Sequence, residues 1–333
     1  MERPVVRILL TTTSYQDTPG PHHDRLAESG FEVVRERGPL SEPRMLELIA
    51  EQTSAGGGFD GLLNGDDAIT ARVIDAALNC PTPLKVIAKY GIGLDSIDVE
   101  HATAKRLPVL FTPGVNHTTV AEHAIGLMIA AAKHFALHLP AVQRGEWKRK
   151  TGTELYGKTL AVLGMGRVGK ELVKRARAFG MHVVGYDLYW DNEFAELHTV
   201  QRQERREEAL AIADVVSLHL PATEDTRELI NADTIAMMKD SSIIINTARG
   251  TLVNEADVAE ACRTGKLAAY ATDVLAEEPM KTPHPFQNLD NVVVTPHVGS
   301  RTLESVQRQA MRATDNLVNF LTGEEDYIQA NTW

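Results

Sequence analysis

Three short segments in the second half of the chain carry side chains whose chemical types complement one another. Arg249 lies within Asn246–Gly250, Glu278 precedes a proline, and His297 follows a run of valines. The planar guanidinium of an arginine suits a carboxylate held by two parallel hydrogen bonds, and a histidine can exchange a proton near neutral pH. Each residue alone has an ordinary explanation, as a surface arginine, a solvated acid or a core histidine. Together they form a set that chance does not readily produce.

Short aliphatic runs that predict β-strands precede these segments. The runs cover residues 242–246, 268–272 and 292–295, and Asp273 directly follows the second of them. Open sheets of parallel strands bind their ligands at the carboxyl ends of the strands. We therefore expect the four polar side chains to lie at one edge of a sheet.

A glycine-rich turn precedes this region and matches the pattern G-x-G-x-x-G. Gly164, Gly166 and Gly169 follow a predicted strand at 159–163 and open a predicted helix at 168–179. In this context the first glycine makes the turn, the second lets the backbone approach a pyrophosphate, and the third allows close packing of helix on strand. The helix N-terminus would face the phosphates with free N–H groups.

Asp187 follows the next predicted strand, at 182–186, and lies 18 residues beyond Gly169. A carboxylate there accepts hydrogen bonds from the ribose hydroxyls of an adenosine and repels a 2′-phosphate, which favours NAD over NADP. A methyltransferase that binds S-adenosylmethionine can carry an acid at the same place. That alternative would leave Arg249, Glu278 and His297 unexplained.

The whole chain alternates short aliphatic runs with helical patterns, which predicts βαβ units and an α/β fold of two doubly wound parallel-sheet domains. The expected strands cover residues 6–10, 31–35, 61–63, 85–88, 159–163, 182–186, 215–218, 242–246, 268–272 and 292–295. The expected helices include 23–29, 45–51, 70–77, a long helix at 118–133, and a further helix at 137–150 that ends in a solvated basic cluster. The mixed charges at 201–208 predict an exposed helix face.

Length and composition agree with two globular domains. The chain has 333 residues and a net charge of −11, so its surface as a whole repels nucleic acid and anionic membranes. Cys80 and Cys262 have no metal-binding spacing, and we expect both to be buried and no metal to be bound. Residues 1–4 and the strand that follows do not resemble a secretory signal, and no apolar run has the length of a membrane span. We expect a cytoplasmic protein.

The motifs together resemble the D-isomer-specific 2-hydroxyacid dehydrogenase family, most closely its 3-phosphoglycerate dehydrogenase-like branch. Besides the glycine-rich turn, the resemblance is carried by Gly91–Asp95, Val120–Ala124, Gly152–Thr159, His219–Pro221, Asn246–Gly250, Glu278–Pro279 and Thr295–His297. It extends from about residue 59 to residue 302.

The resemblance implies a discontinuous architecture. A flavodoxin-like substrate-binding domain would comprise residues 1–115 and 300–333, and a Rossmann-type NAD domain, residues 116–299, would be inserted between them. Relatives usually form homodimers through the NAD domain, so the helix at 118–133 and its extension are the expected interface.

The resemblance also assigns roles to individual residues. Arg249 would hold the substrate carboxylate and polarise the carbonyl, His297 would be the acid/base on the substrate oxygen, and Glu278 would pair with His297. The expected substrate-binding residues are Lys89, Tyr90, Gly91, Ile92, Gly93 and Arg249, with the backbone of Tyr90–Gly93 adding donors. The expected cofactor-binding residues are Gly164, Gly166, Arg167, Val168, Gly169, Asp187, His219, Leu220, Pro221, Thr247, Ala248, Asp273, His297 and Gly299, with Asp273 meeting the nicotinamide carboxamide.

The sequence does not identify which 2-hydroxy acid is the substrate. Phosphoglycerate-oxidising relatives carry an arginine after the third strand, where this chain has Asn64-Gly65-Asp66-Asp67, and two acids suit a phosphate dianion poorly. Candidates are glyoxylate or hydroxypyruvate, a larger 2-keto acid, and a phosphorylated or phosphonylated acid. An NAD-sensing scaffold like the C-terminal-binding corepressors is the alternative of another class. The sequence ends at Trp333, so we expect no separate C-terminal regulatory domain.

Overall fold

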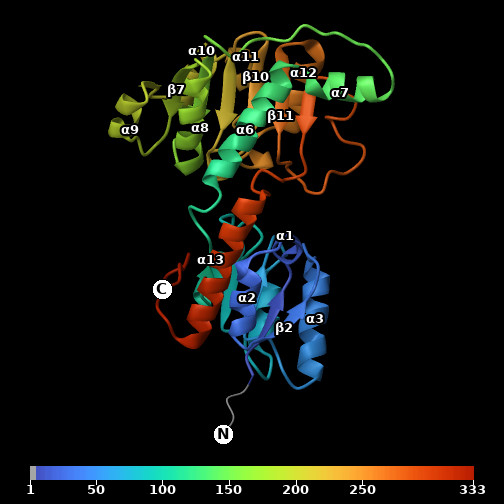
Figure 1. Cartoon of the computed structure of the whole chain (residues 1–333), viewed down its shortest axis with the longest axis vertical. Helices are drawn as coiled ribbons and strands as arrows, with labels where there is room; N and C mark the ends of the chain where they lie inside the picture. The colour runs from blue at the N-terminus through green and yellow to red at the C-terminus, as the bar shows by residue number, and fades with distance from the viewer. Residues whose placement is uncertain (1–4) are drawn as a thin grey trace. The chain divides into compact units, whose positions relative to one another are not determined.

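The computed structural model describes residues 5–333, which divide into two compact units (Figure 1). Unit 1 comprises Met1–Asn116 and Arg301–Trp333, and unit 2 comprises His117–Ser300. These bounds differ by one residue from the expected ones. The expectation that the N-terminus does not resemble a secretory signal rests partly on residues 1–4, which lie outside the described residues.

Unit 1 contains a five-stranded parallel sheet in the order β2-β1-β3-β4-β5. Its strands are β1 (Arg7–Leu10), β2 (Glu32–Arg35), β3 (Gly61–Asn64), β4 (Val86–Lys89) and β5 (Val109–Leu110). This is the strand order of flavodoxin-like folds. The short strand β5 is an addition to the predicted set.

Helices cover both faces of this sheet because alternate strand residues face opposite sides. The helices are α1 (Thr13–Asp17), α2 (Pro21–Glu28), α3 (Glu42–Ser54), α4 (Ala71–Leu78), α5 (Val99–Ala104) and α13 (Leu303–Thr322). Leu9 and Leu62 are buried with residues of α3 and α4, whereas Ile8 and Leu63 are buried with residues of α2 and α13. Helix α13 lies beside α2, although the two come from opposite ends of the chain (Figure 1).

Unit 2 contains a seven-stranded parallel sheet in the order β12-β11-β10-β9-β6-β7-β8. Its strands are β6 (Thr159–Leu163), β7 (His182–Tyr186), β8 (Val200–Arg202), β9 (Val215–Leu218), β10 (Ser242–Asn246), β11 (Leu267–Thr272) and β12 (Val292–Val294). The order reverses at β6, as it does in Rossmann folds, so ligands are expected at the carboxyl ends of β6 and β9. The predicted α/β fold of two doubly wound sheets is confirmed.

The helices of unit 2 also lie on both faces of the sheet. They are α6 (His117–Ala132), α7 (Phe135–Gln143), α8 (Arg167–Ala178), α9 (Asn192–Leu197), α10 (Arg206–Ile212), α11 (Ala232–Met237), α12 (Glu255–Thr264) and the short 3₁₀-helix Gly250–Leu252. Leu160 and Val162 of β6 are buried with residues of α6 and α8, and Ala161 and Leu163 with residues of α10 to α12. Figure 1 shows α6 lying across the sheet.

Two local predictions are wrong. The helix predicted at 137–150 is instead α7, which ends at Gln143, because Gly145 turns the chain with φ of 77° and residues 146–150 have no regular secondary structure. The segment 201–208 is split between β8 and α10, because the Gln203 N–H donates to the Gly185 carbonyl and so extends the sheet edge. The prediction that Cys80 and Cys262 are buried is confirmed.

Within residues 5–333, no single helix is long and apolar enough to cross a membrane. Helices α6 and α7 reach such a length only in combination, with a bend of 72° between them. In the same residues, no group of three or more His, Cys, Asp or Glu side chains could hold a metal ion.

Candidate active site

The glycine-rich turn joins β6 to α8 and depends on two close backbone approaches. Gly164 has φ of 101°, and a Cβ there would lie 2.5 Å from the carbonyl oxygen of His219. A Cβ on Gly169 would lie 2.1 Å from the carbonyl oxygen of Gly164. Both glycines are therefore required by the packing of the fold itself.

Gly166 differs, because nothing lies within 4 Å of the position of a Cβ. It is the N-cap of α8 and is extended, with φ of −69°, a conformation open to any residue. Arg167 and Val168 form the first turn of the helix, where N–H groups have no partner within the helix. The open space at Gly166 and the helix N-terminus fit the pyrophosphate of a dinucleotide.

Asp187 follows β7 and is fixed against the same turn. Its Oδ2 accepts the Met165 N–H at 2.6 Å, and its Oδ1 accepts the Tyr189 N–H at 2.8 Å. Each carboxylate oxygen can accept a second hydrogen bond. Asp187 is therefore oriented by the glycine-rich turn while it keeps acceptor capacity for ribose hydroxyls.

His219, Leu220 and Pro221 follow β9, the strand next to β6. The His219 N–H donates to the Leu163 carbonyl, which prolongs the pairing of the two strands beyond their ends. The His219 ring lies 2.8 Å from the Ser217 hydroxyl, and desolvation lowers its pKa to about 4. A neutral imidazole thus lines this part of the sheet edge at neutral pH.

The loop after β10 is held by Asn246, which is absent from the predicted site residues. The buried Asn246 side chain accepts the Ala248 N–H at 3.0 Å and donates to the Arg249 carbonyl at 2.9 Å. A buried amide at a strand end, with the polar loop after it, is the sequence signal for such a residue. In the same loop the Thr247 hydroxyl oxygen is buried without a hydrogen-bond partner, as expected of a group that meets a ligand.

Arg249 points from this loop with its guanidinium partly constrained, since Nη1 donates to the Ala248 carbonyl at 2.7 Å. Gly250 follows it, and a Cβ there would lie 1.9 Å from the carbonyl carbon of Leu275. The absence of a side chain therefore lets the Arg249 loop and the loop after β11 lie against each other.

The loop after β11 leads to Glu278, and the turn after β12 carries His297. Glu278 Oε2 lies 2.8 Å from His297 Nδ1, and Glu278 Oε1 accepts the Leu275 N–H at 3.0 Å. Because the carboxylate accepts the Nδ1 proton, it fixes the tautomer of the neutral ring, in which Nε2 is the acceptor that can exchange a proton. The His297 side chain is 46% exposed and the Glu278 side chain is 37% exposed, so the pair is accessible to a ligand.

His297 has φ of 52°, a conformation that costs a residue other than glycine about 1–3 kcal/mol. Asp273 holds the strained turn: its carbonyl accepts the His297 N–H, and its carboxylate accepts those of Val298 and Gly299. Asp273 is buried; desolvation raises its pKa, but hydrogen bonds from His123, Thr295 and these amides outweigh it and leave the pKa below its usual value.

In unit 1, Lys89 ends β4 and is almost fully buried. Its Nζ lies 2.5 Å from Asp66 Oδ1 and donates to the Gly65 carbonyl at 2.6 Å. Asp66 is 73% exposed, whereas Asp67 is fully buried and accepts hydrogen bonds from Thr11, Leu40 and Gly65. Of the two acids in the segment 64–67, only Asp66 therefore faces solvent, and it neutralises the lysine.

The backbone of Tyr90–Gly93, expected to add donors for the substrate carboxylate, has two of its N–H groups engaged within unit 1. The Tyr90 N–H donates to the Asn64 carbonyl, and the Gly91 N–H donates to the Thr112 hydroxyl at 3.0 Å. The first bond continues the pairing of β3 and β4 past their ends, and the second joins the segment after β4 to the segment after β5. Among these described residues, the N–H groups of Ile92 and Gly93 remain as donors for a ligand.

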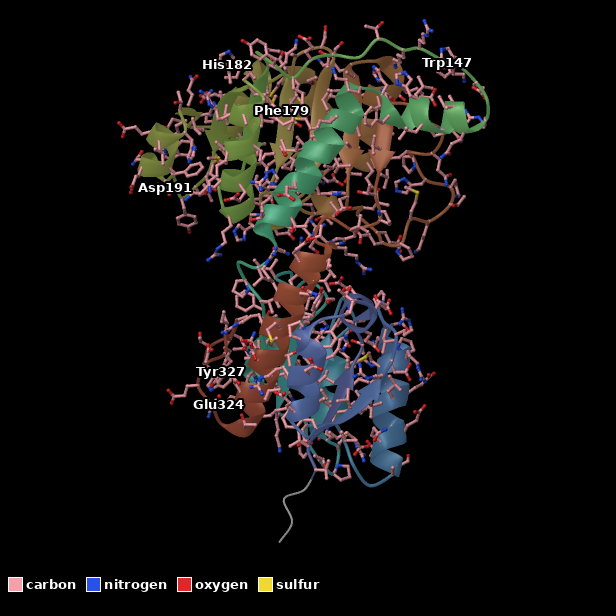
Figure 2. The ribbon with its side chains drawn as sticks, viewed as in Figure 1. Trp147, Phe179, His182, Asp191, Glu324 and Tyr327 are labelled. Atoms are coloured by element: carbon pink, nitrogen blue, oxygen red, sulfur yellow. The ribbon has the colours of Figure 1, made fainter. Side chains whose placement is uncertain are left out.

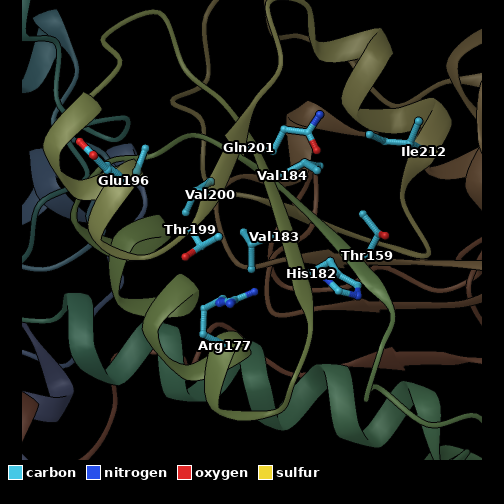
Figure 3. Close-up of a pocket in the computed structure, with 11 residues that line it drawn as sticks. Thr159, Arg177, His182, Val183, Val184, Glu196, Thr199, Val200, Gln201 and Ile212 are labelled. Atoms are coloured by element: carbon cyan, nitrogen blue, oxygen red, sulfur yellow. The ribbon is translucent and has the colours of Figure 1, made fainter.

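A hollow in unit 2 lies away from these residues. It measures about 590 Å³, and its lining includes Thr159 and His182, the first residues of β6 and β7, and Arg177 of α8 (Figure 3). The glycine-rich turn and His297 belong to the opposite, carboxyl edge of the sheet. Because ligands of open parallel sheets bind at the carboxyl edge, the hollow is not the candidate active site.

Residues 125–299 match the family model of the D-isomer specific 2-hydroxyacid dehydrogenase, NAD binding domain. The chain is 39% identical over 322 residues to D-3-phosphoglycerate dehydrogenase of Methanocaldococcus jannaschii, with 96% of this chain and 58% of that protein covered. It is 41% identical over 258 residues to hydroxypyruvate reductase of Thermotoga maritima, with 75% and 80% covered. The solved structure of the TT0316 protein from Thermus thermophilus has 36% identity and a TM-score of 0.85, and covers 98% of this chain and 100% of that one.

The chain belongs to the D-isomer-specific 2-hydroxyacid dehydrogenase family, which confirms the predicted resemblance, including its phosphoglycerate dehydrogenase-like branch. NAD is the cofactor of the domain that it matches. The chain spans somewhat more than half the length of the phosphoglycerate dehydrogenase from M. jannaschii.

Proposed function

We propose that this protein is an NAD-dependent dehydrogenase that interconverts a D-2-hydroxy acid and the corresponding 2-keto acid. The observation that carries the proposal is the accessible Glu278–His297 pair, with Nδ1 and Oε2 2.8 Å apart, at the carboxyl edge of a Rossmann sheet. NAD, when bound, supplies or accepts the hydride at C2 of the substrate. The chain's own residues bind the acid and move the proton.

His297 is the proposed acid/base. Reduction of a keto group needs a proton on its oxygen, and the reverse reaction needs a base there, so the same imidazole serves both directions. Glu278 fixes the ring because its second oxygen is tied to the Leu275 amide. Arg249 binds the carboxylate of the substrate, since its fork geometry suits two-point contact. Thr247, Asp187, His219 and the glycine-rich turn bind NAD.

Unit 1 is the proposed substrate-binding domain, and its substrate is a small unphosphorylated acid. Asp66 already neutralises the buried ammonium of Lys89, and an exposed carboxylate repels a phosphate dianion. The relative from T. maritima is named hydroxypyruvate reductase, which is a precedent for such an acid. The second candidate is a phosphorylated acid, as in the relative from M. jannaschii, whose name is D-3-phosphoglycerate dehydrogenase.

A homodimer through unit 2 is part of the proposal. Helix α7 and the irregular segment after it expose four large apolar side chains, namely Phe135, Leu139, Val142 and Trp147. Figure 2 shows Trp147 on the loop that follows α7. Apolar side chains clustered on one exposed element mark a protein interface more often than a solvated surface.

The test is an assay of 2-keto acids with NADH and with NADPH. We expect oxidation of NADH by glyoxylate or hydroxypyruvate, little oxidation of NADPH because of Asp187, and weaker activity with the phosphorylated analogue. His297→Asn should lower kcat by about 10²-fold or more while NADH still binds. An NAD-sensing scaffold would bind NADH but oxidise it with none of these acids, and unchanged turnover of His297→Asn would remove the histidine from its role.

A further inference from the structure

His123, on the second turn of α6, reaches the end of β11 and the residue after β12. Its Nε2 lies 3.0 Å from the Thr295 hydroxyl oxygen and 3.3 Å from Asp273 Oδ1. The first contact joins residues 172 positions apart in the chain, and the His123 side chain is only 23% exposed. None of the roles discussed above uses this histidine.

The direction of the hydrogen bonds follows from the donors available. The Thr295 hydroxyl lies 2.6 Å from Asp273 Oδ1, and an ionised carboxylate cannot donate, so the hydroxyl donates its one proton to Asp273. The hydroxyl oxygen must therefore accept from His123, whose Nε2 carries a proton. His123, Thr295 and Asp273 form a relay in which the first donor is the imidazole.

The relay ends on the group that holds the turn of His297. Asp273 accepts three consecutive backbone N–H groups through its carbonyl and carboxylate, those of His297, Val298 and Gly299. Gly299 allows the approach, since a Cβ there would lie 2.8 Å from Asp273 Oδ2 and 3.4 Å from His123 Cδ2. The contacts of His123 and Thr295 fix the orientation of this carboxylate from the side opposite the turn.

We infer that His123 is a positioning residue, which orients Asp273 both directly and through Thr295 and thereby keeps the strained turn of His297 in its functional conformation. The inference rests on the proposed role of His297 as acid/base. A displacement of about 1 Å of a reacting group can cost about 10²-fold in rate, so loss of one support can reduce turnover without direct contact to the substrate.

Three variants test the inference. His123→Leu removes the donor, His123→Gln keeps an N–H donor at about the same reach, and Glu122→Gln changes the neighbouring exposed residue, whose partner is Arg175. We expect His123→Leu to lower kcat by about 10- to 100-fold with little change in the Kd for NADH. His123→Gln should recover most of the loss, and Glu122→Gln should match the wild type. Thermal unfolding of each variant shows whether it is folded.

An NMR measurement separates this inference from the proposed function. Histidine-labelled protein, assigned with His297→Asn, reports the Nδ1–H tautomer of His297 set by Glu278, and we expect that signal to shift or broaden in His123→Leu and to return in His123→Gln. An unchanged His297 signal in folded His123→Leu overturns the inference. A loss of kcat in His123→Gln equal to that in His123→Leu also overturns it. If the wild type reduces no 2-keto acid, the proposed function fails, while the NMR result still decides the role of His123.

Discussion

A substitution of Gly166 should separate the effect of the glycine-rich turn on stability from its effect on NADH binding. In Gly166→Ala the added methyl group enters open space, and φ of −69° suits alanine. Loss of the glycine at the N-cap and the lower entropy of the unfolded chain have opposite effects, so we expect the free energy of unfolding to change by less than about 1 kcal/mol. The same methyl group would occupy the path of the pyrophosphate.

Displacement of the pyrophosphate weakens charge-assisted hydrogen bonds worth about 1.5–3 kcal/mol each. We therefore expect the Kd for NADH to rise about 10- to 100-fold, since about 1.4 kcal/mol corresponds to a factor of ten. Fluorescence titration of NADH measures the Kd, and urea unfolding measures the stability.

Gly169→Ala is the matched control, because its Cβ would lie 2.1 Å from the Gly164 carbonyl oxygen and the backbone must move. We expect it to lower the free energy of unfolding by about 1–3 kcal/mol, as overpacking does. Unaltered NADH affinity in Gly166→Ala would refute the assignment of the glycine-rich turn. Equal destabilisation in the two variants would refute the distinction between them.

Two further predictions concern assembly and pH. Leu139→Asp should convert the proposed dimer to monomers in light scattering, whereas the exposed Leu197→Asp, on α9, should not; a monomeric wild type would contradict the proposed dimer. Burial lowers the pKa of His22 below 6.5, and desolvation lowers that of His219 to about 4. Below about pH 6.5 the unfolded chain therefore binds more protons than the folded one. The free energy of unfolding should be independent of these two histidines above about pH 6.5 and fall toward pH 4, by at most about 1.4 kcal/mol per pH unit for each histidine. Urea unfolding at pH 7 and pH 5 checks the slope, which should be shallower in His22→Gln; an equal slope would exclude His22 as a cause.

The sequence allowed the glycine-rich turn, Asp187 and the strand-end positions of Arg249 and His297 to be predicted, because each depends on local periodicity and on a few neighbouring residues. The Glu278–His297 pairing was expected only from the family resemblance, and the 2.8 Å contact now supports it. Family membership could likewise be predicted, since the motifs occur in a fixed order.

The remaining features depend on contacts between distant parts of the chain. Asp66 and Asp67 are adjacent and chemically equal in the sequence, yet one is exposed and the other is buried with three donors. The engagement of the Tyr90 and Gly91 amides depends on β3 and on Thr112. The end of α7 at Gln143 was missed because the basic cluster after Gly145 suits a solvated helix end as well as an irregular segment.

The insertion of unit 2 into unit 1 has a consequence for the order of folding. The core of unit 1 needs both of its chain segments, since the Tyr15 hydroxyl meets Thr314 and Ile8 is buried with Leu317. Unit 2 is continuous, and its own folding brings His123 against Thr295. That contact shortens the effective loop between the two segments from about 180 residues to about 13, which lowers the entropic cost of closure by about 2.4 kcal/mol. Unit 2 is thus expected to fold first and to hold together the two chain segments that form unit 1.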